Sequence, residues 1–259
     1  MGMAQCRLAD HGRWHSVGVG RSWRIEERVG TAALLHDSWP TTVADPDTRA
    51  IGICRVSAPA IVLGSTQPLS VIDAERAEQS GLAVARRRSG GGAVLVTPDD
   101  PVWIDAWVPR GDPLWLDDVA RAFDWLGDAW GRTLANLGIA GATVHRGGLA
   151  ACTSWSSLVC FGGVGTGEVL DPDGRKMVGI SQRRTRHGAW FHSACLRHWD
   201  PDPLLDVLVL EADQRLAAHA ELAAAAIGLD DRVPGDPSSS DIGTQRVVRE
   251  FTNTVPLED

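Results

Sequence analysis

The sequence of 259 residues contains no tyrosine and a single lysine. Of its 25 basic side chains, one is Lys176 and the other 24 are arginine, so arginine carries the ordinary surface charge of this protein. An ammonium group is a compact point charge with three rotatable donors, whereas a guanidinium is a rigid fork. Lys176 also follows an Asp-Pro-Asp-Gly turn and opens an alternating run flanked by glycine and serine, which argues against a stray lysine. Its isolation therefore makes it the first candidate for a role that arginine cannot fill.

Other absences exclude whole classes of protein. Five cysteines without a Cys-x-x-Cys pair argue against a zinc ribbon and favour reduced thiols. No stretch has the length and apolarity of a signal peptide or a membrane span. A net charge of -8 disfavours broad nucleic-acid binding, although local basic clusters occur at 86–88 and 183–186. We therefore expect a soluble, cytoplasmic protein that binds neither nucleic acid nor a membrane.

The order of the periodic segments predicts an α/β (α+β) fold with a mixed, mainly antiparallel sheet flanked by helices. Residues 1–232 are expected to form one domain, and residues 233–259 a linker followed by a short C-terminal segment. Three local expectations follow from the patterns. They are a hairpin-like start from two strands at Ile51 to Val56 and Ala60 to Leu63, a longest helix from Leu114 to Leu137, and a strand at Leu158 to Phe161.

A glycine triplet forms the second candidate site, in the run Arg86-Arg87-Arg88-Ser89-Gly90-Gly91-Gly92-Ala93-Val94. Glycines between two strands let backbone N–H groups approach an anion without interference from Cβ atoms, and the arginines add charged donors. The run is not a Walker loop, because no Gly-Lys-Ser/Thr follows, and it is not a dinucleotide fingerprint, because a strand comes next. A tight turn with a solvated arginine flank is the alternative interpretation.

Taken together, three ordered motifs resemble the lipoate-protein ligase family of the biotin and lipoate ligase superfold. They are the glycine run, the later Gly174-Arg175-Lys176-x-x-Gly179-x-Ser181-Gln182, and Phe191-His192. The resemblance covers about Trp23 to Trp199, and Gln67 resembles an early Gly-x-x-Gln element of the family. It implies a biotin/lipoate ligase-like catalytic domain that attaches a lipoyl or octanoyl group to a lysine of a lipoyl-domain acceptor protein. An ATP-derived acyl-adenylate is the route that we expect.

The resemblance also implies roles for individual residues. Lys176 becomes the catalytic cation, which contacts both the acyl carboxyl group and the α-phosphate of ATP. Glu168 resembles an acidic family position near Mg²⁺, and ATP and Mg²⁺ would be cofactors of a ligase that acts on lipoate or octanoate; the metal ligands stay unassigned. Residues implied in substrate or nucleotide binding are Arg87, Ser89, Gly90, Gly91, Gly92, Ala93, Val94, Leu95, Gly179, Ser181 and His192.

The sequence also departs from the ligase pattern, which keeps two other hypotheses open. Ligases carry an aromatic-His-Asp and a Gly-Asn after the glycine run, where this chain has Leu95-Val-Thr-Pro-Asp-Asp100. Related octanoyltransferases use a cysteine and acyl carrier protein instead of ATP. In one class that cysteine precedes Phe-His-Gly, where this chain has Ala189, and in another it lies in a Cys-Phe loop, which Cys160 matches. The alternatives are therefore a transferase with Cys160 as nucleophile and a non-catalytic binder of lipoate or lipoyl domains.

Overall fold

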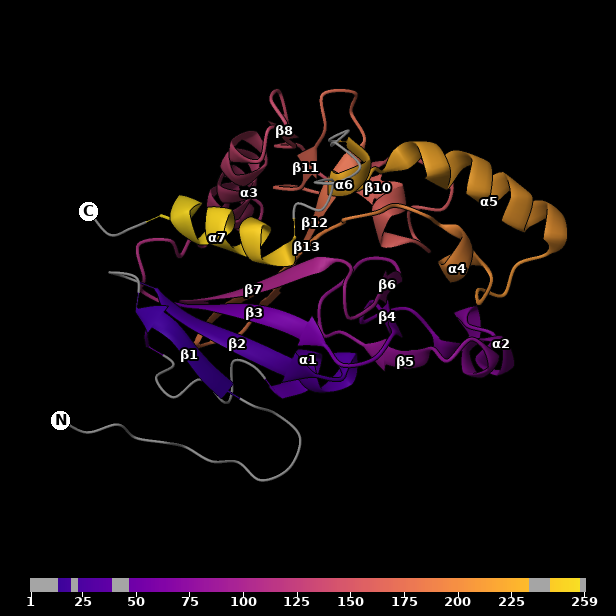
Figure 1. Cartoon of the computed structure of the whole chain (residues 1–259), viewed down its shortest axis with the longest axis horizontal. Coiled ribbons are helices and arrows are strands. Elements are labelled where there is room, and N and C mark those ends of the chain that lie inside the picture. The colour runs from indigo at the N-terminus through magenta and orange to yellow at the C-terminus, as the bar shows by residue number, and fades with distance from the viewer. Residues whose placement is uncertain (1–13, 20–22, 39–46, 233–242, 257–259) are drawn as a thin grey trace.

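An eight-stranded sheet dominates the computed structural model, which describes residues 14–19, 23–38, 47–232 and 243–256. Neighbouring strands are antiparallel except for the parallel pair β2–β3, and Figure 1 shows the first strands at the lower edge of the molecule. In spatial order the strands are β1 (Trp14–Val19), β2 (Arg24–Gly30), β3 (Ala50–Val56), β7 (Val102–Pro109), β13 (Gly188–Cys195), β12 (Lys176–Arg184), β11 (Val169–Leu170) and β8 (Thr143–Val144).

Two smaller sheets lie beside the main one. The first has the order β5-β4-β6, and the second pairs β9 with β10. Their strands are β4 (Ala60–Leu63), β5 (Ala83–Arg86), β6 (Val94–Val96), β9 (Ala150–Ala151) and β10 (Gly163–Val164). The helices are α1 (Ala32–Ser38), α2 (Ala74–Gln79), α3 (Asp124–Asn136), α4 (Asp202–Leu205), α5 (Ala212–Ala225), α6 (Leu229–Arg232) and α7 (Thr244–Thr254), with short 3-10 turns at Leu69–Val71, Arg121–Phe123 and Cys160–Gly162.

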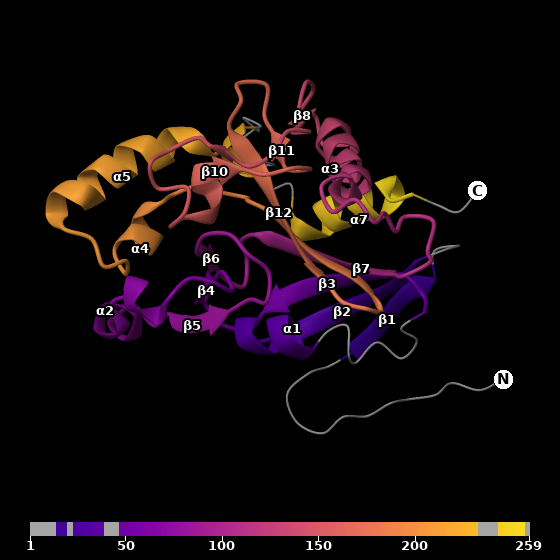
Figure 2. The same cartoon turned by 180° about the vertical axis from the view of Figure 1, so that it is seen from behind.

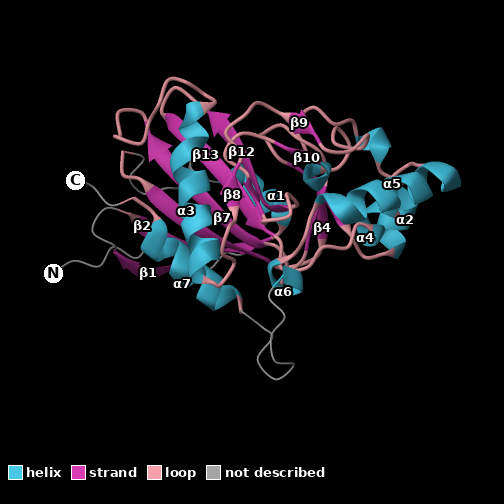
Figure 3. Ribbon diagram, turned by 90° about the horizontal axis from the view of Figure 1, so that it is seen from above, coloured by secondary structure: helices cyan, strands magenta, loops and turns pink. Residues whose placement is uncertain are grey.

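Strand β7 shows why the main sheet has two different faces. Its side chains alternate, and Ile104 and Ala106 join the large core beneath α3 and α7, which lie over the sheet in Figure 3. Trp103 points to the opposite face, where α1 and the small sheet cover it. Figure 2 shows α1 next to β2, β3 and β5 on that side. Because both faces are covered, every residue of β7 is buried.

The predicted fold class is confirmed, and three local expectations are wrong. Strands β3 and β4 do not form a hairpin, because β3 pairs with β2 and β7 whereas β4 pairs with β5 and β6. The apolar run from Leu114 forms turns, and α3 begins only at Asp124. The helix expected to be the longest is therefore one residue shorter than α5. Cys160 lies in a 3-10 turn rather than in a strand.

The C-terminal segment is docked on the domain. Phe251 of α7 is fully buried and packs on Trp130 of α3, with 4.7 Å between their ring centroids. Trp23 donates from Nε1 to the carbonyl oxygen of Pro256 at 2.7 Å. The linker, which we expect after residue 232, falls on residues 233–242, which lie outside the described residues. In the described part of the chain, no helix is long and apolar enough to cross a membrane.

Candidate active site

Lys176, at the first position of β12, is buried and held by oxygen acceptors. Its Nζ atom lies 2.6 Å from Oε2 of Glu168 and donates to the carbonyl oxygens of Cys160 at 2.9 Å and Gly163 at 3.0 Å. The ammonium also lies 4.9 Å from the ring centroid of Phe161. The lone lysine of the chain is therefore a positioned, desolvated cation whose side chain is only 2% exposed.

A shift in strand register explains how Lys176 reaches this position. Leu170 of β11 pairs with Lys176 while the adjacent Val169 pairs with Val178, so β12 contains one extra residue at this point. The extra residue interrupts the alternation of side chains between the two faces of the sheet. The Lys176 side chain consequently lies next to Gly179. A Cβ atom on Gly179 would lie 3.4 Å from Cε of Lys176 and 3.4 Å from Cζ of Phe161. Gly179 therefore lies in direct contact range of both the lysine side chain and Phe161.

Glu168, which resembles an acidic family position near Mg²⁺, is the ion-pair partner of Lys176 in the structure. Its Oε2 atom also accepts from the backbone N–H of Gly165 at 2.6 Å, and Oε1 accepts from that of Ile180 at 3.0 Å. Both oxygens therefore already have donors. The residues that the structure describes contain no group of three or more His, Cys, Asp or Glu side chains arranged to hold a metal ion.

The glycine loop packs against the turn that contains Cys160. The N–H group of Cys160 donates to the carbonyl oxygen of Ala93 at 2.9 Å. A Cβ atom on Gly92 would lie 2.6 Å from the backbone carbon of Val159 and 2.7 Å from the nitrogen of Cys160. Gly91 has φ of +101°, and only Gly90 faces open space. Two of the three glycines are thus required by the fold itself.

Arg87 and Gln67 support this loop from inside. The guanidinium of Arg87 donates to the carbonyl oxygens of Gly90, Gly92 and Val62, and the residue is only 4% exposed. Gln67 accepts from the N–H of Gly64 at 2.9 Å and donates to the carbonyl oxygen of Leu158 at 3.0 Å. Arg87 therefore fixes the shape of the loop, in addition to any contact with a ligand.

A cavity of about 50 Å³ lies between the glycine loop, the Cys160 turn and the sheet. It brings together residues that are far apart in the sequence. The predicted site residues in its lining are Arg87, Val94, Cys160, Gly179, Ser181 and His192. Ser89 contacts this group, because its Oγ atom lies 2.9 Å from that of Ser181. Ala93 and Leu95 instead line an adjoining hollow of about 140 Å³, and Val94 and Phe161 border both spaces.

A buried carboxylate, which the sequence reasoning did not assign to the site, organises the far side of the cavity. Asp105 lies opposite His192 in the β7–β13 register, and its Oδ1 atom is 2.8 Å from Nδ1 of His192. The same carboxylate accepts from Arg28 at 2.7 Å, from Trp103 at 2.6 Å and from Trp190 at 3.0 Å. Burial alone would raise the pKa of Asp105, but His192 and Arg28 lower it to about 2. An acidic residue inside an otherwise apolar strand was the sequence signal for this cluster.

His36 of α1 also borders the cavity and was missed by sequence reasoning. Its ring lies 4.4 Å from Trp103 and 4.9 Å from His192, measured between ring centroids. Burial, with the neighbouring His192, holds the pKa of His36 well below its usual value. No sequence pattern indicated this role, because α1 is separated along the chain from the motifs that form the cavity.

Comparison with known proteins identifies the family. The model of the lipoyl protein ligase A/B catalytic domain matches residues 33–252. The chain belongs to this family. It is 30% identical over 216 residues to the octanoyltransferase LipM of Moorella thermoacetica, covering 78% of this chain and 73% of that protein. The family comprises ligases and transferases, so membership makes this protein a lipoate ligase or octanoyltransferase-type enzyme.

Solved structures of lipoate ligases share the fold. A bipartite lipoate protein ligase of Thermoplasma acidophilum, studied with its E2 lipoyl domain, has a TM-score of 0.60 and 20% identity, covering 80% of this chain and 71% of that one. A lipoate-protein ligase A bound with ATP has a TM-score of 0.61 and 18% identity, covering 91% and 85%. At this level of identity the similarity establishes the biotin/lipoate ligase fold.

The glycine loop can be tested with two matched substitutions. Gly92→Ala should lower the free energy of unfolding by about 1 to 3 kcal/mol, because its Cβ atom meets backbone that cannot move aside. Gly90→Ala should change it by less than about 0.5 kcal/mol, because that Cβ atom faces open space. Urea unfolding of both variants measures the difference. Equal effects of the two substitutions would contradict the described packing of the loop.

His36 should make stability depend on acidity. The neutral folded form binds no proton at His36, whereas the unfolded chain binds one below about pH 6.5, so the free energy of unfolding falls as the pH is lowered. Relative to wild type, His36→Phe should become progressively more stable as the pH is lowered from about 6.5, by at most about 1.4 kcal/mol per pH unit. Urea unfolding across this range measures it. Parallel curves for the two proteins would show that His36 keeps an ordinary pKa.

Proposed function

We propose that this enzyme transfers an octanoyl or lipoyl group from acyl carrier protein to a lysine of a lipoyl-domain protein, through a thioester on Cys160. The observation that carries the proposal is the position of Cys160. Cys160 lines the cavity together with residues of the family motifs, and its carbonyl oxygen accepts a hydrogen bond from Lys176. A cysteine at the reacting end of an acyl-binding cavity can act as a nucleophile. The 30% identity to an octanoyltransferase supports this choice.

The chemistry divides into two acyl transfers. In the first, the Cys160 sulfur attacks the thioester carbon of the acyl carrier protein, the bond to the carrier sulfur breaks, and the thiol proton ends on that sulfur. In the second, the acceptor lysine attacks the Cys160 thioester, an amide forms, and a proton from the amine restores the Cys160 thiol. Negative charge develops on the carbonyl oxygen in both steps. The buried ammonium of Lys176 donates to the carbonyl oxygen of Cys160 and would stabilise this charge through its electrostatic field, since Glu168 and the carbonyl oxygens of Cys160 and Gly163 already take its three donors.

The remainder of the site would serve to hold the acyl chain. The cavity wall includes Val94, Val96 and Phe161, and each buried CH₂ group of a chain contributes about 0.8 kcal/mol. The acceptor is proposed to be a lipoyl domain because a fold relative from Thermoplasma acidophilum was studied with its E2 lipoyl domain. We propose that the reaction takes place in the cytoplasm, as expected from the sequence.

ATP-dependent ligation is the second candidate, and the adjoining hollow beside Ala93 and Leu95 favours it as a space for a nucleotide. Its lining fits a triphosphate poorly, however. It contains the carboxylates of Asp100 and Asp200 and no lysine or arginine. Asp100 also accepts from the backbone N–H groups of Arg197 and His198, so the segment that replaces the ligase His-Asp element ties down a loop. The proposed mechanism therefore uses neither ATP nor Mg²⁺.

Intact mass spectrometry separates the routes. Wild-type enzyme incubated with octanoyl acyl carrier protein should gain the mass of one octanoyl group, and Cys160→Ala should lose both this adduct and transfer to a lipoyl domain. The matched control is Cys152→Ala, which removes an exposed cysteine outside the cavity lining and should keep the adduct.

The ligase route predicts a different outcome. If Cys160→Ala transferred octanoate to the lipoyl domain in the presence of ATP and Mg²⁺, with pyrophosphate release, the thioester mechanism would be wrong. Absence of both activities from wild-type enzyme would instead favour a non-catalytic binder.

A further inference from the structure

The cavity has two chemically different ends. Near one end are Cys160, Phe161 and Gly179, which lie beside the ammonium of Lys176. At the other end are His36, Trp103 and His192, whose rings contact one another. His192 lies opposite Ser181, two residues beyond Gly179 on β12, which is about 7 Å further along the strand. An acyl chain whose carbonyl carbon lies at Cys160 would therefore extend towards the imidazoles.

The imidazole of His192 is held in one orientation with one nitrogen left over. An ionised carboxylate only accepts hydrogen bonds, so Nδ1 of His192 must donate to Asp105. Nε2 is then left to bond a ligand, as an acceptor in the neutral ring or as a donor in the protonated ring. This atom is buried without a hydrogen-bond partner among the described residues, and His192 as a whole is 6% exposed.

His36 adds a second unsatisfied nitrogen at the same end. Its Nδ1 atom is also buried without a hydrogen-bond partner in the described part of the chain, and the residue is 5% exposed. Buried polar atoms in proteins are nearly always hydrogen-bonded, so two such atoms in one cavity wall call for a partner. The plain methyl end of an octanoyl chain would leave both nitrogens unpaired and would lose stability by doing so.

We propose that the His36–His192 end of the cavity is a hydrogen-bonding subsite that recognises a hydroxyl or thiol group near the far end of the acyl chain. The fitting substrates are medium-chain acyl groups with a terminal hydroxyl or with thiols, such as an 8-hydroxyoctanoyl or a dihydrolipoyl group. A hydroxyl is the stronger donor of the two, so it should bind better than a thiol. This inference deepens the proposed function, since it rests on the cavity being the acyl site.

The test uses the free acids as probes, with octanoic and 8-hydroxyoctanoic acid titrated calorimetrically into Cys160→Ala enzyme. The alanine background removes the nucleophile, so the preference is measured whether or not Cys160 forms a thioester. The hydroxy acid should bind about tenfold more tightly than octanoic acid, which corresponds to one net hydrogen bond of about 1.4 kcal/mol. His192→Phe in the same background should abolish or reverse this ratio, because phenylalanine offers no acceptor.

A variant at the other wall provides the matched control. Val94→Ala shortens an apolar side chain of the cavity without changing its hydrogen-bonding groups, so it should weaken both acids and keep their ratio. Equal affinities, a preference of the Cys160→Ala enzyme for octanoic acid, or no binding of either acid would each overturn the subsite, even if the His192 variant fails to fold. An unchanged ratio in folded His192→Phe would do the same. If wild-type enzyme formed no thioester on Cys160 but the hydroxy acid still bound more tightly than octanoic acid, only the proposed mechanism would be overturned.

Discussion

The buried ion pair between Lys176 and Glu168 is the interaction on which the rest of the site depends. It joins the start of β12 to the Gly165 turn, and the remaining donors of the lysine fix the carbonyl oxygens of Cys160 and Gly163. Removing one member of such a pair would leave an uncompensated buried charge, at a cost of about 3 to 5 kcal/mol. The reacting end of the cavity is therefore rigid because its charges are satisfied by the protein before any substrate binds.

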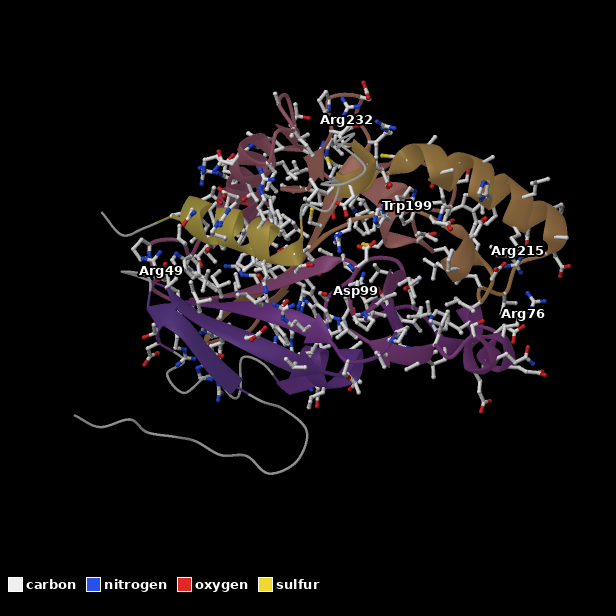
Figure 4. All side chains as sticks on the ribbon, viewed as in Figure 1. Arg49, Arg76, Asp99, Trp199, Arg215 and Arg232 are labelled. Carbon is white, nitrogen blue, oxygen red and sulfur yellow. The ribbon has the colours of Figure 1, made fainter. Side chains whose placement is uncertain are left out.

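Asp105 fixes the opposite end in a comparable way, by accepting from one arginine, two indoles and His192. Between these two ends the cavity wall is mostly apolar. The glycine loop packs so closely on the backbone of the Cys160 turn that a Cβ atom at Gly92 would not fit. Trp199, labelled in Figure 4, donates to the carbonyl oxygen of Leu222 in α5 and lines the adjoining hollow. The architecture thus provides one apolar space with a polar group at each end.

The motifs predicted part of this arrangement, because they encode local backbone demands. Arg87 and Val94 of the glycine run, Gly179 and Ser181 of the Lys176 segment, and His192 line one cavity together with Cys160. The sequence did not reveal that Glu168 pairs with Lys176, because that contact depends on an extra residue in β12 that alternation alone does not show. His36 was missed because only tertiary packing brings α1 to the cavity. The prediction of a helix from Leu114 was wrong because the first apolar residues of this run form turns that pack against the core.

The most direct test of the central role of Lys176 is the single-turnover rate of octanoyl transfer to a lipoyl domain by Lys176→Arg. The variant keeps the positive charge opposite Glu168 but replaces the point charge by a broad fork. Compared with wild type at a temperature at which circular dichroism shows both to be folded, the rate should fall roughly a hundredfold to a thousandfold. A folded variant whose rate stays within about tenfold of wild type would contradict the account.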